Sequence, residues 1–319
     1  MKLHVDRDNF KDLIEIVSSE LNLDKKIIEK DYWITYALSK LSEANNENVI
    51  FRGGTSLTKC YIDLKRFSED IDLAINTSNL NNTQIKKIMR NTEKIMTDKF
   101  IEVDDGDNIK SGDYRKVQYK YESIVGNNKG IYELGELNEN IKIETVTFLK
   151  PNPYEKRKVK SMIYDYLEKK NMIDVIEEFQ LEPFDINVLS IKRTILDKIV
   201  SLIRMSYEDG IEELKGKTRH LYDLHLTFEF LRDFYENKAE LKRIIQLVLD
   251  DEEKSKFKDK YPYKEKWNKA PIWNIINSGD LKEYYEDRFW KSFVYGKLPA
   301  YEDVVKSINK IREYIQLIE

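Results

Sequence analysis

Two closely spaced motifs constrain the fold of this chain more than any other feature of its sequence. The first is Arg52-Gly-Gly-Thr-Ser-Leu-Thr-Lys59 and the second is Arg66-Phe-Ser-Glu-Asp-Ile-Asp-Leu73. The apolar residues before the first motif predict a strand over 48–51, and the residues after its glycines predict a helix over 55–62. Because side chains at i and i+2 of a strand point to one face, a strand over 70–75 would place Asp70 and Asp72 side by side. The motifs therefore predict one site that combines a glycine turn with two carboxylates.

The residue types at this site favour a metal ion and a phosphate chain. Asp70 and Asp72 would repel each other unless a cation lies between them. Oxygen ligands of this kind suit Mg²⁺, which proteins usually hold with one or two carboxylates plus substrate phosphates. The glycines at 53–54 allow positive φ and a close approach to the backbone. Thr55 or Ser56 would cap the following helix, whose first N–H groups favour an anion. The alternative is a purely structural one, a surface hairpin with capping residues and no bound ligand.

Composition narrows the class of protein further. The chain has 319 residues, of which 41% are hydrophobic, so it is long enough for one large domain or two ordinary ones. The lone Cys60 excludes a disulfide framework and fits a reducing compartment. The first residues contain no apolar segment of a signal peptide, and no apolar run is long enough to span a membrane. The sequence therefore predicts a cytoplasmic protein with no membrane contact.

Charge bears on the expected partners. The formal net charge is −4, whereas a nonspecific nucleic-acid binder is usually basic overall. Any contact with RNA would therefore have to be local. The candidate basic segments are residues 156–160 and 215–219. In the alternative interpretation they bind nothing and are solvated runs of charge.

The pattern along the chain predicts an α+β fold that changes near residue 152 from mixed helices and strands to helices. Apolar spacing predicts helices over 6–20, 24–43 and 83–98, and strands over 100–103, 115–121 and 141–148. A loop is expected over 126–130. Beyond residue 153 the pattern is almost wholly helical, with helices expected over 155–169, 191–206, 219–235, 237–249 and 300–317. We therefore expect one domain over 1–152, with N-terminal helices and a mixed sheet, and a helical domain over 153–319.

These motifs resemble a known family. The two strings quoted above are close to the signature of the AbiEii/AbiGii toxin family of bacterial abortive-infection (antiviral defence) and type IV toxin–antitoxin systems. That family belongs to the nucleotidyltransferase superfamily of DNA polymerase β. Ile28-Glu-Lys-Asp-Tyr-Trp33 resembles its N-terminal helix, Val188-Leu-Ser-Ile-Lys-Arg-Thr-Ile-Leu-Asp-Lys198 its lysine segment, and Arg219-His-Leu-Tyr-Asp-Leu224 its last acidic motif. One departure is His220, which stands where the last motif often has Asp.

The resemblance implies a polymerase-β-like core, with the helical domain completing an active-site cleft. It implies an enzyme that moves a nucleoside monophosphate from an NTP to an acceptor hydroxyl and releases pyrophosphate. The acceptor it implies is an RNA, the 3′ end of tRNA, and the partner is a cognate antitoxin with a winged-helix DNA-binding domain. The site residues are then catalytic Asp70, Asp72, Lys198 and Asp223; nucleotide-binding Gly53, Gly54, Thr55, Ser56, Lys59 and Arg66; and metal-binding Asp70, Asp72 and Glu144.

Three of these assignments have bland alternatives. Glu144 is the candidate for the third acid that many polymerase-β-like enzymes carry. A β-bulge near 144–145, where the apolar residues change from odd to even positions, would turn its side chain toward the site. In the alternative interpretation it is an ordinary edge-strand glutamate. Lys198 would neutralise the triphosphate, or else snorkel from an apolar helix face. Asp223 would orient Lys198 or the acceptor with Arg219 bracing it, or else form a simple i,i+4 ion pair with Arg219.

Two rival functions use the same fold. One is a transferase that modifies a small molecule such as an antibiotic, and the other is a non-catalytic nucleotide-binding regulator. The intact acidic pair, the glycine turn and Lys198 speak against the second. The sequence argues against other chemistries, because it has only three histidines and one cysteine to bind zinc and contains no Walker A or dinucleotide-binding glycine motif.

Overall fold

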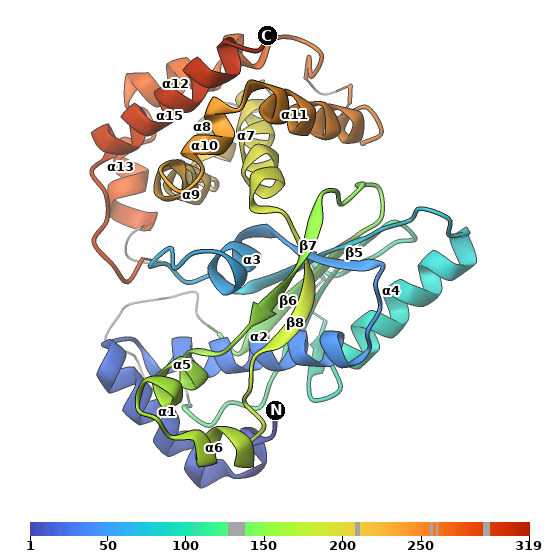
Figure 1. The fold of residues 1–319 in the computed structure, drawn as a ribbon, viewed down its shortest axis with the longest axis vertical. Helices are drawn as coiled ribbons and strands as arrows, with labels where there is room; N and C mark the ends of the chain where they lie inside the picture. Colours follow the sequence, from blue (N-terminus) through green and yellow to red (C-terminus); the bar gives the residue numbers. More distant parts are fainter. Residues whose placement is uncertain (105, 127–137, 208–210, 256–257, 260, 290–293) are drawn as a thin grey trace. The chain divides into compact units, whose positions relative to one another are not determined.

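The structure is a computed structural model that describes residues 1–104, 106–126, 138–207, 211–255, 258–259, 261–289 and 294–319. Within these residues, eight strands form one mixed sheet in the order β3-β5-β6-β2-β1-β8-β7, with β4 paired to β5 (Figure 1). The strands are β1 (Val49–Arg52), β2 (Asp70–Ile75), β3 (Ile101–Val103), β4 (Ile109–Lys110), β5 (Tyr114–Lys120), β6 (Asn140–Val146), β7 (Tyr154–Val159) and β8 (Phe184–Leu189). The pairs β2–β6 and β1–β8 are parallel, and the other pairs are antiparallel.

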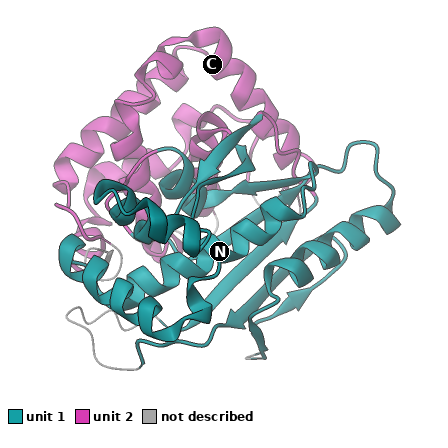
Figure 2. Cartoon of the chain, turned by 60° about the horizontal axis from the view of Figure 1, so that its bottom comes forward, with its two compact units in different colours: residues 1–61, 67–147, 154–189 teal, residues 62–66, 148–153, 190–319 magenta. Residues whose placement is uncertain are grey.

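The chain divides into two units (Figure 2). Unit 1 comprises residues 1–61, 67–147 and 154–189, and therefore holds the whole sheet. Its helices are α1 (Arg7–Leu21), α2 (Lys25–Glu43), α3 (Gly53–Cys60), α4 (Asn82–Met96), α5 (Met162–Lys169) and α6 (Ile173–Glu178), with a short 3₁₀ helix at Leu3–Val5. Unit 2 comprises residues 62–66, 148–153 and 190–319.

Unit 2 is helical in its described part. Its helices are α7 (Ile191–Tyr207), α8 (Ile211–Lys215), α9 (Thr218–Phe228), α10 (Arg232–Glu236), α11 (Lys238–Glu252), α12 (Ile272–Ser278), α13 (Lys282–Tyr284) and α15 (Tyr301–Gln316), with a 3₁₀ helix at Trp267–Lys269 and a π-helical turn at Tyr285–Phe289. α7 and α15 both pack on α9. The apolar stripe of α15, from Val304 to Ile311, is buried, as expected for an amphipathic helix.

One face of the sheet packs against helices of unit 1. Side chains such as Phe51, Ile71 and Leu73 are fully buried. On β5, Arg115 forms an ion pair with Glu93 of α4, so the odd-numbered residues of that strand point toward α4. Because side chains alternate along a strand, the neighbouring even-numbered residues belong to the other face. The two faces therefore differ in character, one apolar and covered, the other carrying polar side chains.

Local sequence explains several helix boundaries. The Asp6 side chain caps α1 by accepting from the Asn9 N–H at 3.1 Å, and Asp24 caps α2 by accepting from the Lys26 N–H at 2.8 Å. Asn81 and Gln84 form a reciprocal capping box at the start of α4. None of the described helices combines the length and apolar character needed to cross a bilayer.

The expected fold class is confirmed, but the domain boundary and one helix differ. The mixed sheet follows two N-terminal helices and precedes helices, as expected. The predicted helix over 155–169 is wrong in its first part, because β7 occupies Tyr154–Val159, and β8 adds a further strand. Both strands belong to unit 1, so the long helical segment begins at Ser190 and not at residue 153. The loop expected over 126–130 lies outside the described residues except for Gly126.

Candidate functional site

The two carboxylates of the second motif share one face of β2. The observed strand, Asp70–Ile75, has the predicted bounds. Asp70 and Asp72 are partly exposed, whereas Ile71 and Leu73 between and after them are buried on the opposite face. Across the neighbouring strand β6, Asp70 pairs in register with Lys142, and Asp72 with Glu144. The sheet therefore gathers three acidic residues and one lysine in a single patch, which we call the carboxylate patch.

Lys142 is the cation that forms ion pairs with Asp70 and Glu144 of this patch. Its Nζ lies 2.9 Å from Oδ2 of Asp70 and 3.8 Å from Oε1 of Glu144. Burial alone would lower the pKa of Lys142, but the nearby carboxylates of Asp70, Glu144 and Asp72 raise it above its ordinary value. The lysine is therefore charged at neutral pH and partly offsets the repulsion among the three carboxylates.

Glu144 reaches the patch without the predicted bulge. β6 pairs residue by residue with β2 over 142–146 and with β5 over 140–146, so the expected bulge at 144–145 is wrong. The change of apolar parity has another cause, because Val146, on the same face as Glu144, is buried at the strand end. The Tyr114 hydroxyl donates to Oε2 of Glu144 at 3.3 Å. Burial, followed by the charges of Glu144 and Asp72, raises the pKa of Tyr114 to about 12, so it stays a donor.

The glycine turn lies against Asp72. Gly53 is the first residue of α3 and has φ of +81°, a conformation that L side chains rarely adopt. A Cβ built on Gly53 would lie 2.0 Å from Oδ2 of Asp72. Only glycine therefore allows both this backbone conformation and this position of the carboxylate. No side chain caps the N-terminus of α3, in contrast to α1, α2 and α4.

Thr55 and Ser56 are used differently from the predicted caps. α3 begins at Gly53, so both residues lie inside the helix, and both are buried. The Thr55 hydroxyl donates to the carbonyl oxygen of Asp70 and lies 2.9 Å from the Ser68 hydroxyl. The Ser56 hydroxyl donates to the carbonyl of Gly53 at 2.9 Å. The predicted capping role is therefore wrong; Thr55 instead ties the start of α3 to the acidic strand.

The fit of this patch to a divalent cation is partial. Among the described residues, no group of three or more His, Cys, Asp and Glu side chains is arranged to hold a metal ion. Glu144, expected as a third ligand, instead accepts from Tyr114 and faces Lys142. Asp70 and Asp72 remain a suitable pair of oxygen donors, which is the number that Mg²⁺ often takes from a protein beside phosphates and water. The residues thus fit a two-carboxylate site completed by a substrate.

Lys59 has partners of its own within unit 1. Its ammonium forms a buried ion pair with Asp31 and donates to the Thr35 hydroxyl at 2.9 Å and the Lys160 carbonyl at 3.2 Å. Asp31 also accepts from the Met162 N–H at 2.8 Å. These contacts join α2, α3 and the start of α5. They assign Lys59 a structural role, and we do not carry it into the proposed phosphate-binding set.

Unit 2 brings together a second group of predicted residues. The guanidinium of Arg66 donates to both oxygens of Asp223, at 2.6 and 2.8 Å. Nζ of Lys198 lies 3.0 Å from Oδ2 of Asp223 and 3.5 Å from Nδ1 of His220. Asp223 is 0% exposed and Arg66 2% exposed. Lys198 is also buried, and His220 is half-buried. We call these four residues the tetrad; its geometry gives Arg66 an intramolecular carboxylate in place of the predicted nucleotide.

Burial and charge set the protonation of the tetrad. Burial alone would raise the pKa of Asp223, but Arg66 and then Lys198 lower it below its ordinary value. Burial lowers the pKa of Lys198, an effect that Asp223 opposes and Arg66 reinforces. Burial and the charge of Lys198 lower the pKa of His220 well below its ordinary value, so its ring is neutral at pH 7. The sequence predicts that Arg219 braces Asp223; among the described contacts of Asp223, Arg66 forms this ion pair.

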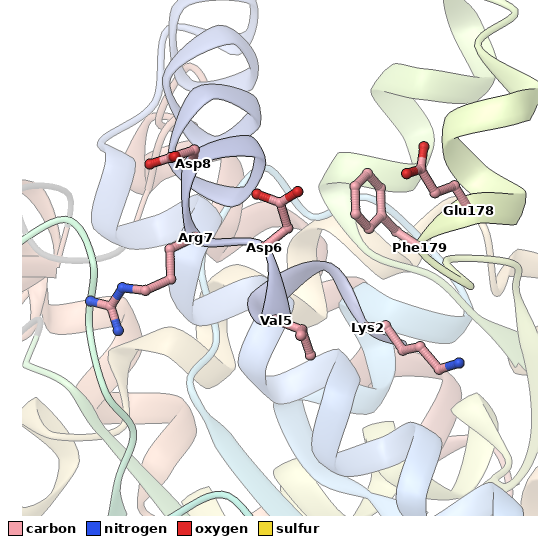
Figure 3. Close-up of a pocket in the computed structure, with 7 residues that line it drawn as sticks. All are labelled: Lys2, Val5, Asp6, Arg7, Asp8, Glu178 and Phe179. Atoms are coloured by element: carbon pink, nitrogen blue, oxygen red, sulfur yellow. The ribbon is translucent and has the colours of Figure 1, made fainter.

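A surface pocket of unit 1 is lined by residues that none of these contacts uses. Figure 3 shows its lining, which comes from the N-terminal segment with its 3₁₀ helix, the start of α1 and the end of α6: Lys2, Val5, Asp6, Arg7, Asp8, Glu178 and Phe179. Asp6 caps α1, and Arg7 pairs with Glu122. The charges that line this pocket are mixed, and we assign it no part in the reaction.

Comparison with known proteins decides the family. The model of the AbiEii family, described as a nucleotidyl transferase AbiEii toxin of a type IV toxin–antitoxin system, matches residues 37–294. The chain belongs to this family. The predicted enzyme class, a nucleotidyltransferase, is thereby confirmed. A search of curated proteins finds no match.

Two solved structures are similar to this AbiEii family member at 14% sequence identity. One is described as a nucleotidyltransferase from H. pylori; the alignment covers 93% of this chain and 99% of that chain, with a TM-score of 0.46. The other is MenT4, a nucleotidyltransferase toxin from Mycobacterium tuberculosis; the alignment covers 96% of this chain and 99% of that chain, with a TM-score of 0.47.

Sequence reasoning missed two residues that the structure adds to the site. Lys142 lies two positions before Glu144 on one strand, and side chains two positions apart point to the same face. Lys142 could therefore have been placed beside Glu144 from the sequence. Tyr114 could not be found in this way, because its pairing with Val146 depends on the register of two strands that are distant in sequence. Unit 1 thus brings together Gly53, Asp70, Asp72 and Glu144, and unit 2 brings together Arg66, Lys198 and Asp223.

Proposed function

We propose that this AbiEii family member transfers a nucleoside monophosphate from an NTP to a hydroxyl of an RNA, the 3′ end of tRNA, and acts in the cytoplasm. Asp70 and Asp72 would hold Mg²⁺, which supplies charge for the phosphates and acidifies the attacking hydroxyl. The observation that carries the proposal is the contact of Gly53 with Asp72. It brings the Asp72 carboxylate directly against the first residue of α3, so that a metal on Asp72 and a phosphate at the N-terminus of α3 would be neighbours.

The other residues support this reaction in different ways. The uncapped N-terminus of α3, which includes Gly54, offers backbone N–H groups to a phosphate. Thr55 fixes that terminus to Asp70. Lys198 would neutralise the charge that builds on the leaving pyrophosphate, a role that rests on the sequence resemblance. Asp223 and Arg66 are positioning residues that act through Lys198. That unit 2 completes the active site stays a prediction.

Transfer assays test the chemistry and the acceptor together. Each α-labelled NTP is incubated with Mg²⁺, the purified protein and either total RNA or a panel of aminoglycosides. We expect label on RNA of tRNA size. Asp70→Asn and Asp72→Asn should each reduce the rate by about 10²-fold or more, because each removes a negative charge from the metal site. Asp185→Asn is the matched control, since the exposed Lys158 is the ion-pair partner of Asp185 among the described residues.

Three outcomes would count against the proposal. Label on an aminoglycoside and not on RNA would favour the small-molecule transferase. Retention of more than a tenth of the rate in Asp72→Asn, at unchanged melting temperature, would remove Asp72 from the metal site. Loss of activity in the Asp185→Asn control would show that the assay reports stability and not chemistry.

The toxin role has its own test in cells. A family of type IV toxins implies an antitoxin, and we propose that it carries a winged-helix DNA-binding domain. Induction of the chain alone should halt growth of a bacterial host, because a nucleotide added to an RNA 3′ end blocks later use of that end. Asp72→Asn should not halt growth at matched protein levels. Equal growth with both proteins would contradict the toxin role.

A further inference from the structure

The carboxylate patch already contains a cation, and its position is informative. Nζ of Lys142 lies 2.9 Å from Oδ2 of Asp70, which is one of the two proposed metal ligands, and 3.8 Å from Oε1 of Glu144. Lys142 and Asp70 face each other in register on parallel strands, so the pair is built into the sheet. Their side chains are 29% and 18% exposed, so water screens this pair less than it screens a surface ion pair.

We propose that Lys142 is an internal counter-ion that competes with the divalent metal for Asp70 and so sets the metal requirement of the enzyme. This inference rests on the proposed function, because it takes Asp70 and Asp72 as the metal ligands. When the metal binds, the ammonium of Lys142 gives up its contact with Asp70 and stays on Glu144. Glu144 thereby serves as the acceptor of the displaced lysine, a role distinct from that of a third metal ligand.

Charge balance supports this exchange. Asp70, Asp72 and Glu144 carry three negative charges in neighbouring register positions, and Lys142 offsets one of them. Arg52 lies opposite Asp72 and Lys116 lies opposite Glu144 on the neighbouring strands, whereas Lys142 lies against Asp70. With Lys142 held on Asp70, the incoming metal meets both a positive charge and a carboxylate that is already paired. With Lys142 on Glu144, the metal meets Asp70 without the competing ammonium of Lys142.

Metal binding without turnover tests the proposal. The probe is Mn²⁺ alone, titrated into the full-length protein and followed by the electron paramagnetic resonance of free Mn²⁺. Lys142→Met removes the charge and keeps most of the side-chain volume, and we expect it to tighten Mn²⁺ binding by about tenfold. Lys142→Arg keeps the charge and should bind Mn²⁺ as the wild type does.

A control separates the local effect from net charge. Lys158→Met makes the same change of charge on β7, at the edge of the same sheet, where Lys158 pairs with Asp185 at 3.4 Å and is 66% exposed. It should leave Mn²⁺ binding unchanged. A second readout is the melting temperature. Without metal, Lys142→Met should melt lower than the wild type because the carboxylates repel, and saturating Mn²⁺ should raise its melting temperature more than that of the wild type.

The outcomes distinguish this inference from the proposed function. If Asp72→Asn loses Mn²⁺ but Lys142→Met binds it no more tightly than the wild type, the metal site stands and the competition is overturned. Weaker binding in Lys142→Met would also overturn it, since the lysine would then be orienting Asp70 for the metal. If neither the wild type nor Lys142→Met binds Mn²⁺, or if Asp72→Asn binds it as tightly as the wild type, the proposed metal site falls and the inference falls with it.

Discussion

Gly53 shows at the scale of one residue how a missing side chain makes room for a charged group. Its φ of +81° costs an L residue about 1–2 kcal/mol, and a Cβ would lie 2.0 Å from Oδ2 of Asp72. Gly53→Ala should therefore both destabilise the protein and displace the carboxylate. We expect a fall in the free energy of unfolding in urea and a loss of transfer rate of about tenfold or more.

Gly279 provides the matched control for this prediction. It has a φ of +85° at the end of α12, but a Cβ there would have no heavy atom within 4 Å. Gly279→Ala should thus show the backbone strain without the steric clash, and full transfer activity. If Gly53→Ala and Gly279→Ala lost equal stability and both kept full activity, the contact between Gly53 and Asp72 would have no functional importance.

The sequence predicts some site residues well for a physical reason. Asp70, Asp72 and Gly53 could be found because their geometry depends on local rules, the period of a strand and the conformational freedom of glycine. The partners of Arg66 and Lys59 could not. Each pairs with a carboxylate far along the chain, Asp223 and Asp31 respectively, and no local pattern shows that the charge is already neutralised.

At the scale of elements, the chain segment 62–66 depends on a buried ion pair. The segment precedes β2 in sequence and belongs to unit 2, where the Tyr222 hydroxyl donates to the Leu64 carbonyl at 2.6 Å. Arg66 then reaches Asp223 of α9. Because removal of Asp223 leaves Arg66 and Lys198 buried without their carboxylate, we expect Asp223→Ala to lower the free energy of unfolding by about 3–5 kcal/mol. Arg66→Ala leaves Asp223 paired with Lys198 and should lower it by less.

A double-mutant cycle in urea measures this pair. The double variant should lose less stability than the sum of the single variants, with a coupling of about 0.5–3 kcal/mol, since its partners are lost together. Arg232→Ala is the control, because Arg232 forms an exposed i,i+3 pair with Glu229 and its removal should leave stability unchanged. Additive losses at Arg66 and Asp223 would mean that the two residues stabilise the protein independently.

Elements differ in how far the sequence predicts them. β2, α1, α2 and α7 are predicted to within about one residue because each has a clear period. β7 is missed because it is an edge strand whose residues Glu155 to Lys158 are all charged, so no apolar alternation marks it. β8 is missed because its place in the sheet depends on β1, more than a hundred residues earlier, through a parallel pairing of Phe51 with Val188. The resulting boundary error at residue 152 follows directly from these two strands.

At the scale of the whole molecule, all three histidines are disfavoured as cations. Burial lowers the pKa of His4 to about 4, with Lys99 adding to the effect, and burial also lowers the pKa of His225. Burial and Lys198 lower the pKa of His220 well below its ordinary value. The unfolded chain therefore takes up protons as the pH falls below about 6.5, whereas the folded chain does so only at lower pH.

This difference predicts a loss of stability on mild acidification. For each such histidine, the free energy of unfolding falls by at most about 1.4 kcal/mol per pH unit between the unfolded pKa and the lowered folded pKa. The lowered pKa of Asp223 affects stability only at more acidic pH. The stability that Asp223 contributes is fully present above about pH 3.8 and is lost as the pH falls through the pKa of the folded state. Between pH 6.5 and 5, the histidines should therefore dominate over Asp223.

His220→Asn isolates the contribution of the histidine beside Lys198. Asparagine keeps a polar side chain beside Lys198 but does not titrate, so the variant should lose less stability than the wild type between pH 7 and 5. Urea unfolding at pH 7, 6 and 5 measures the difference directly. His225→Asn, at a half-buried ring that bonds to Ser307 at 2.8 Å, should give a smaller change. Parallel pH profiles for His220→Asn and the wild type would show that His220 is protonated equally in the folded and unfolded chain, contrary to its burial beside a charged lysine.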